Sequence, residues 1–265
     1  MASIRFDNVQ KYFGQGPKAI RVLEDINLEV KDKEFVAIVG PSGCGKTTCL
    51  RLVAGFEQVN EGTVSVSGKT VTEPGPDRAV VFQQFALFPW KTVRENIDLG
   101  LRNKNAPAAE RAERIARVLK LMNLESHADA FPHQLSGGMQ QRVAIARAYV
   151  LDPEVLLMDE PFGALDAQTR VVMQEELVRL SRTIPRTVLF ITHAVEEAVY
   201  LADRVAIMTR RPGRIKEVLD IKTVRDAENW DRFPKIEDVM DLDSFVHLRT
   251  QIWKSLREEK NVHAG

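Results

Sequence analysis

The chain has little cysteine, no excess charge of either sign and no long apolar segment. Its 265 residues include two cysteines, so neither a disulfide framework nor a cysteine-rich metal site is expected. Lys plus Arg and Asp plus Glu both number 37, which argues against a basic surface for nucleic acid. No apolar run reaches the about 18 residues of a membrane-spanning helix, and the first residues lack the apolar core of a signal peptide. We therefore expect a cytosolic protein that does not cross a membrane.

The order of apolar segments predicts an α/β fold. Early strands separated by short turns indicate a small antiparallel sheet, and a later alternation of strands and helices indicates a parallel core. Helical patterns dominate between these two regions. The expected strands are 4–9, 28–30, 35–39, 63–66, 80–82, 155–158, 188–191 and 205–208, and the expected helices of the middle region are 93–101, 109–122 and 138–149.

The segment 40–47, Gly-Pro-Ser-Gly-Cys-Gly-Lys-Thr, matches the phosphate-loop pattern G-x-x-x-x-G-K-[ST]. In this pattern glycines let backbone N–H groups close on phosphate oxygens, lysine supplies a positive charge and threonine a magnesium ligand. An apolar strand, 34–39, precedes the loop, and a helix, 46–54, follows it. This context favours nucleotide binding over a simple Gly-rich turn. The candidate nucleotide-binding residues are Gly40, Pro41, Ser42, Gly43, Cys44, Gly45, Lys46, Thr47 and Thr48.

A second phosphate element is the apolar strand 155–158, which ends in Asp159 and Glu160. Buried carboxylates at the carboxyl end of a strand are costly unless a cation or a substrate neutralises them. Asp159 suits a magnesium shell, and Glu160 is placed to polarise the water that attacks the γ-phosphate of ATP. The alternative is a helix N-cap in a following turn.

Ser136, Gly137 and Gly138 begin another predicted helix and create a second anion-binding helix end. The phosphate loop 40–47 does not require this second helix end for its own phosphate site. A chain with two anion-binding sites therefore suggests that two chains bind each nucleotide. The motif 135–140, Leu-Ser-Gly-Gly-Met-Gln, ends at Gln140 and precedes the acidic strand. In this combination the chain resembles the ATP-binding cassette (ABC) superfamily, whose ATP lies between opposed protomers.

The resemblance assigns further roles. Phe13 stands where similar proteins stack an aromatic ring on adenine; Tyr12 is a weaker candidate, and core filling is the alternative. Gln83 matches the glutamine that meets magnesium, the lytic water and the partner subunit, with Gln84 as the fallback. His193, which follows an apolar strand, matches the histidine that contacts the γ-phosphate.

The resemblance also implies the fold and the complete site. Asp166 ends the loop 163–166 that links the two sites of the dimer, with Gly163 where serine is commoner. The implied fold is a P-loop NTPase of ABC type, with a mixed core sheet, an antiparallel β subdomain and a helical signature subdomain. The implied cofactors are ATP and Mg²⁺. The catalytic set is Glu160, His193, Gln83 and Lys46, and the metal set is Thr47, Gln83 and Asp159.

Residues 85–90, Phe-Ala-Leu-Phe-Pro-Trp, form an apolar cluster directly after the glutamine. Such a cluster is either core or a groove for another protein's helix, and we favour the groove. In similar transporters this region receives a helix of the membrane subunit. A helix is expected to begin near Thr92, with Glu95 completing a capping box.

Further segments, 73–78, 87–90, 159–166 and 196–199, look like those of bacterial importers of nitrate, sulfonates, taurine and bicarbonate. This likeness implies a second ATPase subunit (a homodimer or a close paralogue), transmembrane permease subunits and an extracytoplasmic binding protein. The implied location is the cytoplasmic face of the plasma (inner) membrane, as a peripheral subunit. Alternatives are an importer of another small solute, or an ABC ATPase that acts on ribosomes or DNA.

We expect a catalytic domain over 1–222, with its helical subdomain at about 86–150, and a helical tail over 223–265. In the tail, Phe245, Leu248, Ile252 and Leu256 share one helix face, and Asp243 or Ser244 is available as the cap. This face either packs on the domain itself or contacts a regulator or the permease.

Overall fold

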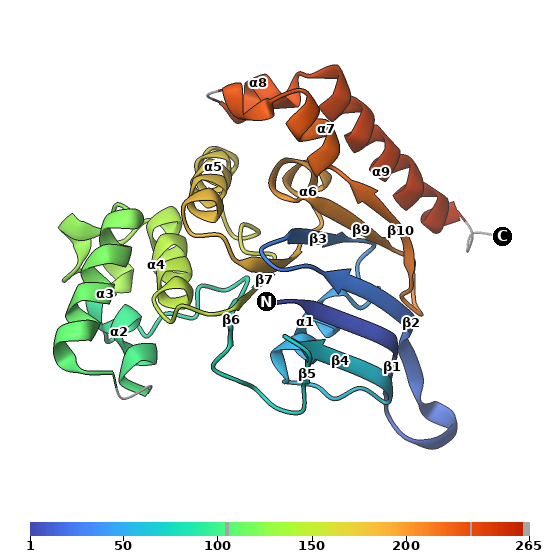
Figure 1. Ribbon diagram of the computed structural model, residues 1–265, viewed down its shortest axis with the longest axis horizontal. Coiled ribbons are helices and arrows are strands. Elements are labelled where there is room, and N and C mark those ends of the chain that lie inside the picture. Colours follow the sequence, from blue (N-terminus) through green and yellow to red (C-terminus); the bar gives the residue numbers. More distant parts are fainter. Residues whose placement is uncertain (104–105, 234, 262–265) are drawn as a thin grey trace. The chain divides into compact units, whose positions relative to one another are not determined.

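The computed structural model describes residues 1–103, 106–233 and 235–261 (Figure 1). Its internal contacts divide the chain into two compact units. Unit 1 is formed by Met1–Gly75 and Pro185–Gly265, and unit 2 is formed by Pro76–Ile184.

Unit 1 contains the predicted antiparallel sheet. Its strand order is β2 (Ile20–Val30), β1 (Ile4–Phe13), β4 (Glu61–Val66) and β5 (Lys69–Thr70). Strands β1 and β2 are longer than the sequence pattern predicts, and β5 was not predicted. A short 3-10 helix, η1 (Gly16–Lys18), connects β1 to β2.

A mixed arrangement of strands lies beside this sheet in unit 1. Strand β3 (Phe35–Val39) pairs in parallel with both β8 (Thr187–Ile191) and β9 (Arg204–Met208). Strand β10 (Ile215–Asp220) pairs antiparallel with β9 and was not predicted. Every residue of β3 and β8 is buried, as expected for parallel strands covered on both faces. Helices α1 (Lys46–Ala54) and α6 (Val195–Leu201) follow β3 and β8 along the chain.

The tail of unit 1 contains α7 (Lys222–Ala227), η4 (Trp230–Arg232), α8 (Ile236–Met240) and α9 (Asp243–Asn261). The predicted apolar face of α9 packs against its own unit, where Phe245, Leu248 and Ile252 are buried and α9 contacts α6 and β9. The helix begins at Asp243, so neither expected cap precedes it; Ser244 instead donates to a carboxylate oxygen of Glu228. Residues 262–265 of the expected tail lie outside the described residues.

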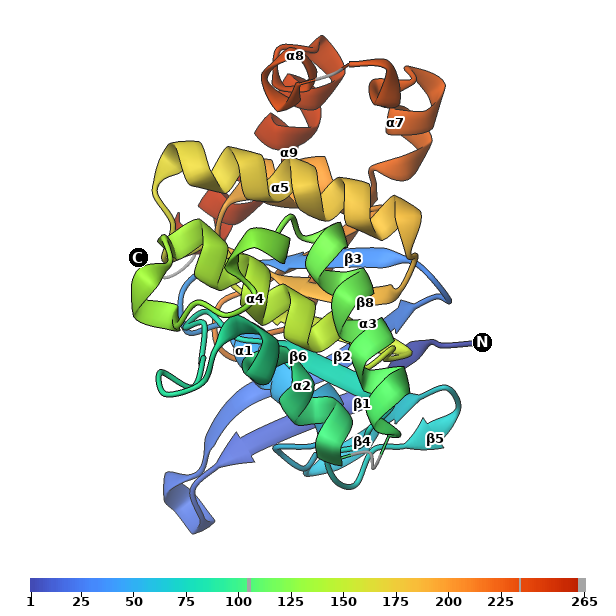
Figure 2. The same cartoon turned by 90° about the vertical axis from the view of Figure 1, so that its left-hand side faces the viewer.

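Unit 2 is mainly helical. Strands β6 (Arg78–Val81) and β7 (Val155–Asp159) form a parallel pair. Between them lie α2 (Val93–Asn103), α3 (Ala108–Leu121) and α4 (Gly137–Tyr149), together with the 3-10 helices η2 (Glu125–His127) and η3 (Pro132–Gln134). Helix α5 (Ala167–Thr183), labelled in Figure 2, follows β7 along the chain. The three helices predicted between the strands are confirmed within two residues at each end.

The predicted capping box at the start of α2 is confirmed. Glu95 N donates to Thr92 Oγ1 at 3.3 Å, and Thr92 N donates to Glu95 Oε2 at 2.9 Å. This bond from the Thr92 backbone lowers the pKa of the Glu95 carboxyl.

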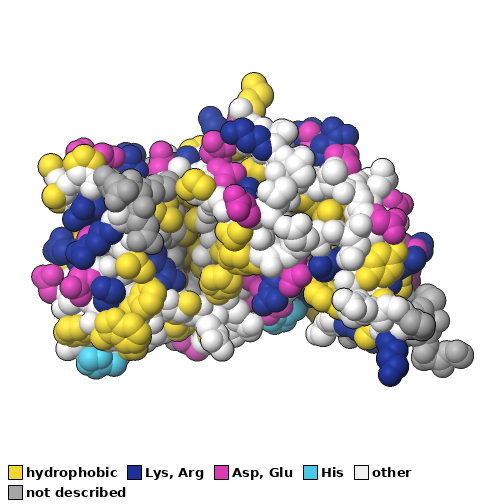
Figure 3. Space-filling model, turned by 90° about the horizontal axis from the view of Figure 1, so that it is seen from below, with side chains coloured by type: hydrophobic (Ala, Val, Ile, Leu, Met, Phe, Trp, Pro, Cys, Tyr) yellow, Lys and Arg dark blue, Asp and Glu magenta, His cyan; other side chains and the backbone are white. Residues whose placement is uncertain are grey.

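Surface charge is mixed on the face shown in Figure 3, where basic and acidic side chains alternate with apolar ones. Within residues 1–103, 106–233 and 235–261, no helix combines the length and the apolar character needed to cross a bilayer.

Candidate functional site

The predicted phosphate loop directly follows β3, and its last two residues, Lys46 and Thr47, begin α1. Lys46 folds into the loop: its Nζ donates to Gly40 O at 2.8 Å and to Pro41 O at 3.2 Å, and the side chain is buried. Backbone N–H groups at the start of α1 have no partner within the helix, which makes this end suited to anions. The loop therefore combines a positive charge with N–H donors in the way that phosphate binding requires.

The loop packs closely against β2. Gly45 has a φ of +105°, and a Cβ atom at this position would lie 2.5 Å from Leu23 Cδ2. Only glycine satisfies both conditions. Cys44 is buried inside the loop with 1% of its surface exposed, and this burial raises the pKa of its thiol. The thiol therefore fills space in the loop.

Phe13, the predicted adenine contact, lies at the end of β1 with 40% of its surface exposed. The ammonium group of Lys11 lies 4.9 Å from the centre of its ring. Tyr12 differs, because its hydroxyl donates to Gln10 and the Arg21 guanidinium lies 5.1 Å from its ring centre. This arrangement leaves Phe13 the better candidate.

His193 is exposed in the segment between β8 and α6. Because β3 and β8 are parallel, with Ile38 opposite Ile191, His193 lies at the same sheet edge as the phosphate loop. Its neighbour Thr192 donates from Oγ1 to buried Glu197 at 2.6 Å and accepts from Ala194 N at 3.0 Å. These bonds fix the backbone on both sides of the histidine.

In unit 2, Gln83 and Glu160 come from the carboxyl ends of the parallel strands β6 and β7. Asp159 ends β7, and Val81 pairs with Met158. Gly163 lies next to both candidate residues: its N–H donates to Glu160 O at 3.0 Å, and a Cβ atom on it would lie 3.1 Å from Gln83 Nε2. The structure therefore brings Gln83 and the backbone of Glu160 together.

The motif 135–140, which we call the signature motif, lies at the start of α4, the signature helix. Ser136 Oγ accepts from Met139 N at 3.3 Å and is the N-cap of the helix. Gln140 Nε2 donates to Pro132 O and Leu135 O, at 3.1 and 3.2 Å. These bonds shape the turn that carries Ser136 and Gly137, both of which are exposed.

Asp166 is the N-cap of α5. It accepts from Thr169 N at 3.0 Å and from Thr169 Oγ1 at 2.7 Å, and the backbone bond lowers the pKa of its carboxyl. Thr169 also lies against the signature helix, since a Cβ atom on Gly138 would be 2.5 Å from Thr169 Cγ2. Thr169 therefore contacts both Asp166 of the loop 163–166 and Gly138 of the signature motif.

The predicted site residues fall into two sets. Unit 1 holds Phe13, Gly40–Thr48 and His193; unit 2 holds Gln83, Ser136, Gly137, Gly138, Gln140, Asp159, Glu160 and Asp166. The three predicted metal ligands, Thr47, Gln83 and Asp159, offer hydroxyl, amide and carboxylate oxygens. This oxygen-only donor set fits Mg²⁺, which prefers hard oxygen ligands.

Around the segment 85–90 the structure adds two residues that the sequence did not single out. Arg147 donates to Ala86 O at 2.6 Å and to Phe85 O at 3.1 Å, and burial lowers the pKa of its guanidinium. Buried Asn96 accepts from Phe88 N at 2.9 Å and donates to Lys91 O at 3.0 Å. Both residues hold the apolar segment 85–90 in place, while Trp90 in that segment is 70% exposed.

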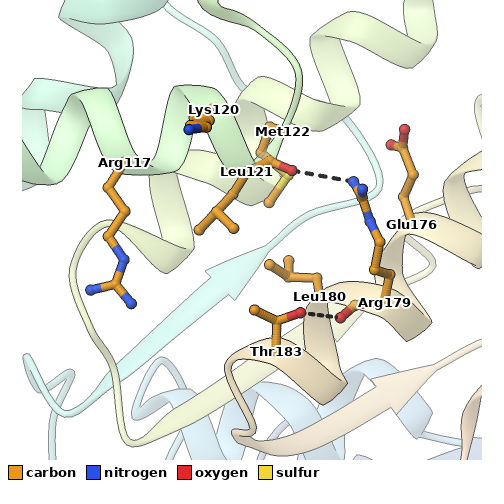
Figure 4. Close-up of a pocket in the computed structure, with 8 residues that line it drawn as sticks. All are labelled: Arg117, Lys120, Leu121, Met122, Glu176, Arg179, Leu180 and Thr183. Atoms are coloured by element: carbon orange, nitrogen blue, oxygen red, sulfur yellow. Dashed lines mark hydrogen bonds between the residues drawn. The ribbon is translucent and has the colours of Figure 1, made fainter.

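A pocket of about 320 Å³ lies between α3 and α5 (Figure 4). Its lining combines basic side chains with Leu121, Met122 and Leu180, and Arg179 within it donates to Leu121 O at 3.4 Å. None of the predicted nucleotide-binding residues lines it.

Comparison with known proteins decides the family. Residues 23–163 match the family model described as ABC transporter. The chain belongs to the ABC transporter family. An uncharacterized ABC transporter ATP-binding protein of Methanocaldococcus jannaschii is 47% identical over 96% of this chain and 94% of its own length. A taurine import ATP-binding protein of Rhizobium johnstonii is 39% identical over 99% of both chains.

A solved structure agrees with this assignment. A dimeric ATP-binding cassette in a post-hydrolysis state, bound to ADP and Pi, is 34% identical, with a TM-score of 0.71 over 82% of this chain and 98% of that one. The ABC fold expected from the motifs is confirmed, and the chain is an ABC ATPase that binds ATP. It is of the type that includes the taurine import relative, as its motifs predict.

Proposed function

We propose that this chain is the ATP-hydrolysing subunit of a bacterial ABC importer for a small anion such as nitrate, an aliphatic sulfonate, taurine or bicarbonate. The observation that carries this proposal is the likeness to the taurine import protein over 99% of both chains. The segments 73–78 and 196–199, which resemble those of such importers, support it. The solute does not touch the ATPase in such systems, so the proposal names a class.

Nucleotide binding uses Phe13 and the phosphate loop. The exposed ring of Phe13 offers a π surface to adenine, and Lys46 with the N–H groups of residues 43–48 holds the phosphates. Thr47, Gln83 and Asp159 would hold Mg²⁺, which neutralises charge on the phosphate oxygens when bound.

Hydrolysis is assigned to Glu160, which accepts a proton from the attacking water. Gln83 orients that water, consistent with its position beside the Glu160 backbone. His193 contacts the γ-phosphate from the sheet edge that also carries the phosphate loop. The Thr192 to Glu197 bond holds this histidine segment for the contact.

A second subunit completes each nucleotide site. Ser136, Gly137, Gly138 and Gln140 of one subunit cap the ATP held by the other, and Asp166 lies on the loop that connects the two sites. The exposed Ser136 and Gly137 at the start of α4 support this role, and the similar solved cassette is dimeric.

The segment 85–90 is the proposed contact with the permease. It presents an exposed Trp90 on a backbone held by Arg147 and Asn96, so the surface is both apolar and fixed. The subunit would act at the cytoplasmic face of the plasma membrane, together with an extracytoplasmic binding protein. We propose 1–222 as the catalytic domain, about 86–150 as its helical subdomain and 223–265 as a tail.

The test is a Glu160→Gln variant. We expect it to bind ATP normally, to lose turnover by a factor of about 10³ or more and to accumulate as a nucleotide-bound dimer. A tagged Glu160→Gln protein with ATP should recover a multi-span permease from detergent-solubilised host membranes. Rapid ATP hydrolysis by the Glu160→Gln variant would show that Glu160 does not accept the proton from the attacking water. Recovery of ribosomes or DNA factors in place of a permease would overturn the import function.

A further inference from the structure

The turn between β9 and β10 contains three arginines and lies against the phosphate loop. We call residues 209–214, Thr-Arg-Arg-Pro-Gly-Arg, the arginine turn. Two bonds close it: Thr209 N donates to Arg214 O at 3.0 Å, and Arg214 N donates to Thr209 Oγ1 at 2.9 Å. Two others attach it to β2, because Gly213 N donates to Val22 O at 2.8 Å and Glu24 N donates to Gly213 O at 3.0 Å.

The arginine turn approaches the phosphate loop at two points. A Cβ atom on Gly213 would lie 2.0 Å from Cys44 O, so any other residue would push the turn away from the loop. At the second point, Arg211 Nη2 lies 3.9 Å from the position of a Cβ atom on Gly43. The turn is therefore fixed where it places the Arg211 guanidinium beside Gly43 of the phosphate loop.

The other two arginines of the turn have different contacts. Arg214 forms an ion pair with Glu24 at 2.7 Å, and the backbone N–H of Arg210 donates to Glu259 at 3.3 Å. Among the residues that the structure describes, no carboxylate forms an ion pair with Arg211. Its guanidinium therefore carries an uncompensated charge, and it is the arginine of the turn that lies beside Gly43.

Three positive features lie at the phosphate loop: Arg211, Lys46 and the N-terminal end of the α1 dipole. Cations are unfavourable at the N-terminus of a helix, and like charges raise the cost further. Such an arrangement is favourable when an anion of several charges is held nearby. The established ATP binding of the family supplies such an anion.

We propose that Arg211 is a second cationic residue for the nucleotide, which strengthens binding of the triphosphate by its charge from beside Gly43. Its role is electrostatic, and Lys46 remains the direct phosphate ligand. The proposal depends on ATP binding at this loop and is independent of the transported solute.

The experiment measures the Kd of the magnesium complex of AMPPNP, a non-hydrolysable ATP analogue, by isothermal titration at 50 mM and 500 mM NaCl. We expect Arg211→Ala to weaken binding about tenfold at low salt and less than about threefold at high salt, because salt screens the charge. Arg211→Lys should stay within about threefold of the wild type, and Arg211→Glu should lose more than Arg211→Ala.

Arg210→Ala is the matched control, since it removes the same charge from the same turn at a side chain that does not lie beside Gly43. It should change Kd less than about twofold. Thermal melting of the nucleotide-free variants distinguishes an effect of the lost charge from an effect on folding. If Arg211→Ala melts at a lower temperature than the wild type, Arg211→Gln is used in its place. The proposal would be overturned if Arg211→Ala or Arg211→Gln bound the analogue like the wild type. It would also be overturned if the loss of affinity were the same at both salt concentrations, or if Arg211→Lys bound as weakly as Arg211→Ala.

Discussion

At the scale of a single residue, Cys44 shows that a place in a functional loop does not make a thiol reactive. It is buried, and burial raises its pKa, so its thiolate fraction at pH 7 is below that of an exposed cysteine. The second cysteine, Cys49, is also buried, and burial raises its pKa as well. Neither the loop cysteine, Cys44, nor the helix cysteine, Cys49, is therefore an exposed nucleophile.

We predict that a maleimide labels the folded protein slowly at pH 7 and faster as the pH rises, because the thiolate is the reacting form and a raised pKa shifts its appearance to higher pH. Mass spectrometry after timed labelling measures the rate, and the same protein in denaturant is the control, with both of its cysteines reacting. Rapid labelling of the folded protein at pH 7 would contradict the burial of Cys44.

At the scale of an element, α2 depends on its capping box. Thr92→Ala removes the hydroxyl that accepts from Glu95 N, and we predict a loss of about 1 kcal/mol in the free energy of unfolding. Urea unfolding followed by circular dichroism measures this loss. Thr250→Ala, at an exposed position inside α9, is the control and should not destabilise the protein. Equal effects of the two substitutions would exclude a capping role for Thr92.

Elements with strong local patterns were predictable, and elements stabilised by distant partners were not. Strand β3 and helix α1 have the predicted bounds because an apolar run, a glycine loop and a helical pattern follow one another. Strand β10, Ile-Lys-Glu-Val-Leu-Asp, has no alternation of period two and lies at the edge of its sheet, so its antiparallel pairing with β9 is what defines it as a strand. Strand β1 has irregular register and a positive φ at Asn8, which obscure its period of two.

The site residues show the same division. Gln83, Glu160 and His193 follow apolar strands, and strand ends place side chains at one edge of a sheet, so their positions could be predicted. Arg147 reaches backbone oxygens about 60 residues away in the chain, and no local pattern records such a contact. Thr169 was missed for the same reason, because its contact with Gly138 comes from the packing of two helices.

At the scale of the whole molecule, the tail is part of the packed interior of unit 1. Phe245 is fully buried, and its ring lies 5.7 Å from that of Trp230. We predict that Phe245→Ala lowers the free energy of unfolding by about 3–5 kcal/mol, as large cavities in a core do. Thermal and urea unfolding measure this change.

The control is Val246→Ala, one residue further along α9 on its exposed side, which should change stability by less than about 0.5 kcal/mol. Deletion of residues 240–265 should then yield an aggregated or unfolded protein. An intact ATPase after this deletion, with altered transport only, would show that α9 serves regulation and is not needed for folding.

The three tryptophans differ widely in their exposure: Trp230 is 3% exposed, Trp253 is 42% exposed and Trp90 is 70% exposed. Replacing Trp253 by phenylalanine would leave two indoles, of which Trp90 faces solvent and Trp230 is a shielded internal reference. Collisional quenching by acrylamide would then act mainly on Trp90. The protein thus contains an intrinsic fluorescence probe, without any attached dye, for whatever covers the segment 85–90.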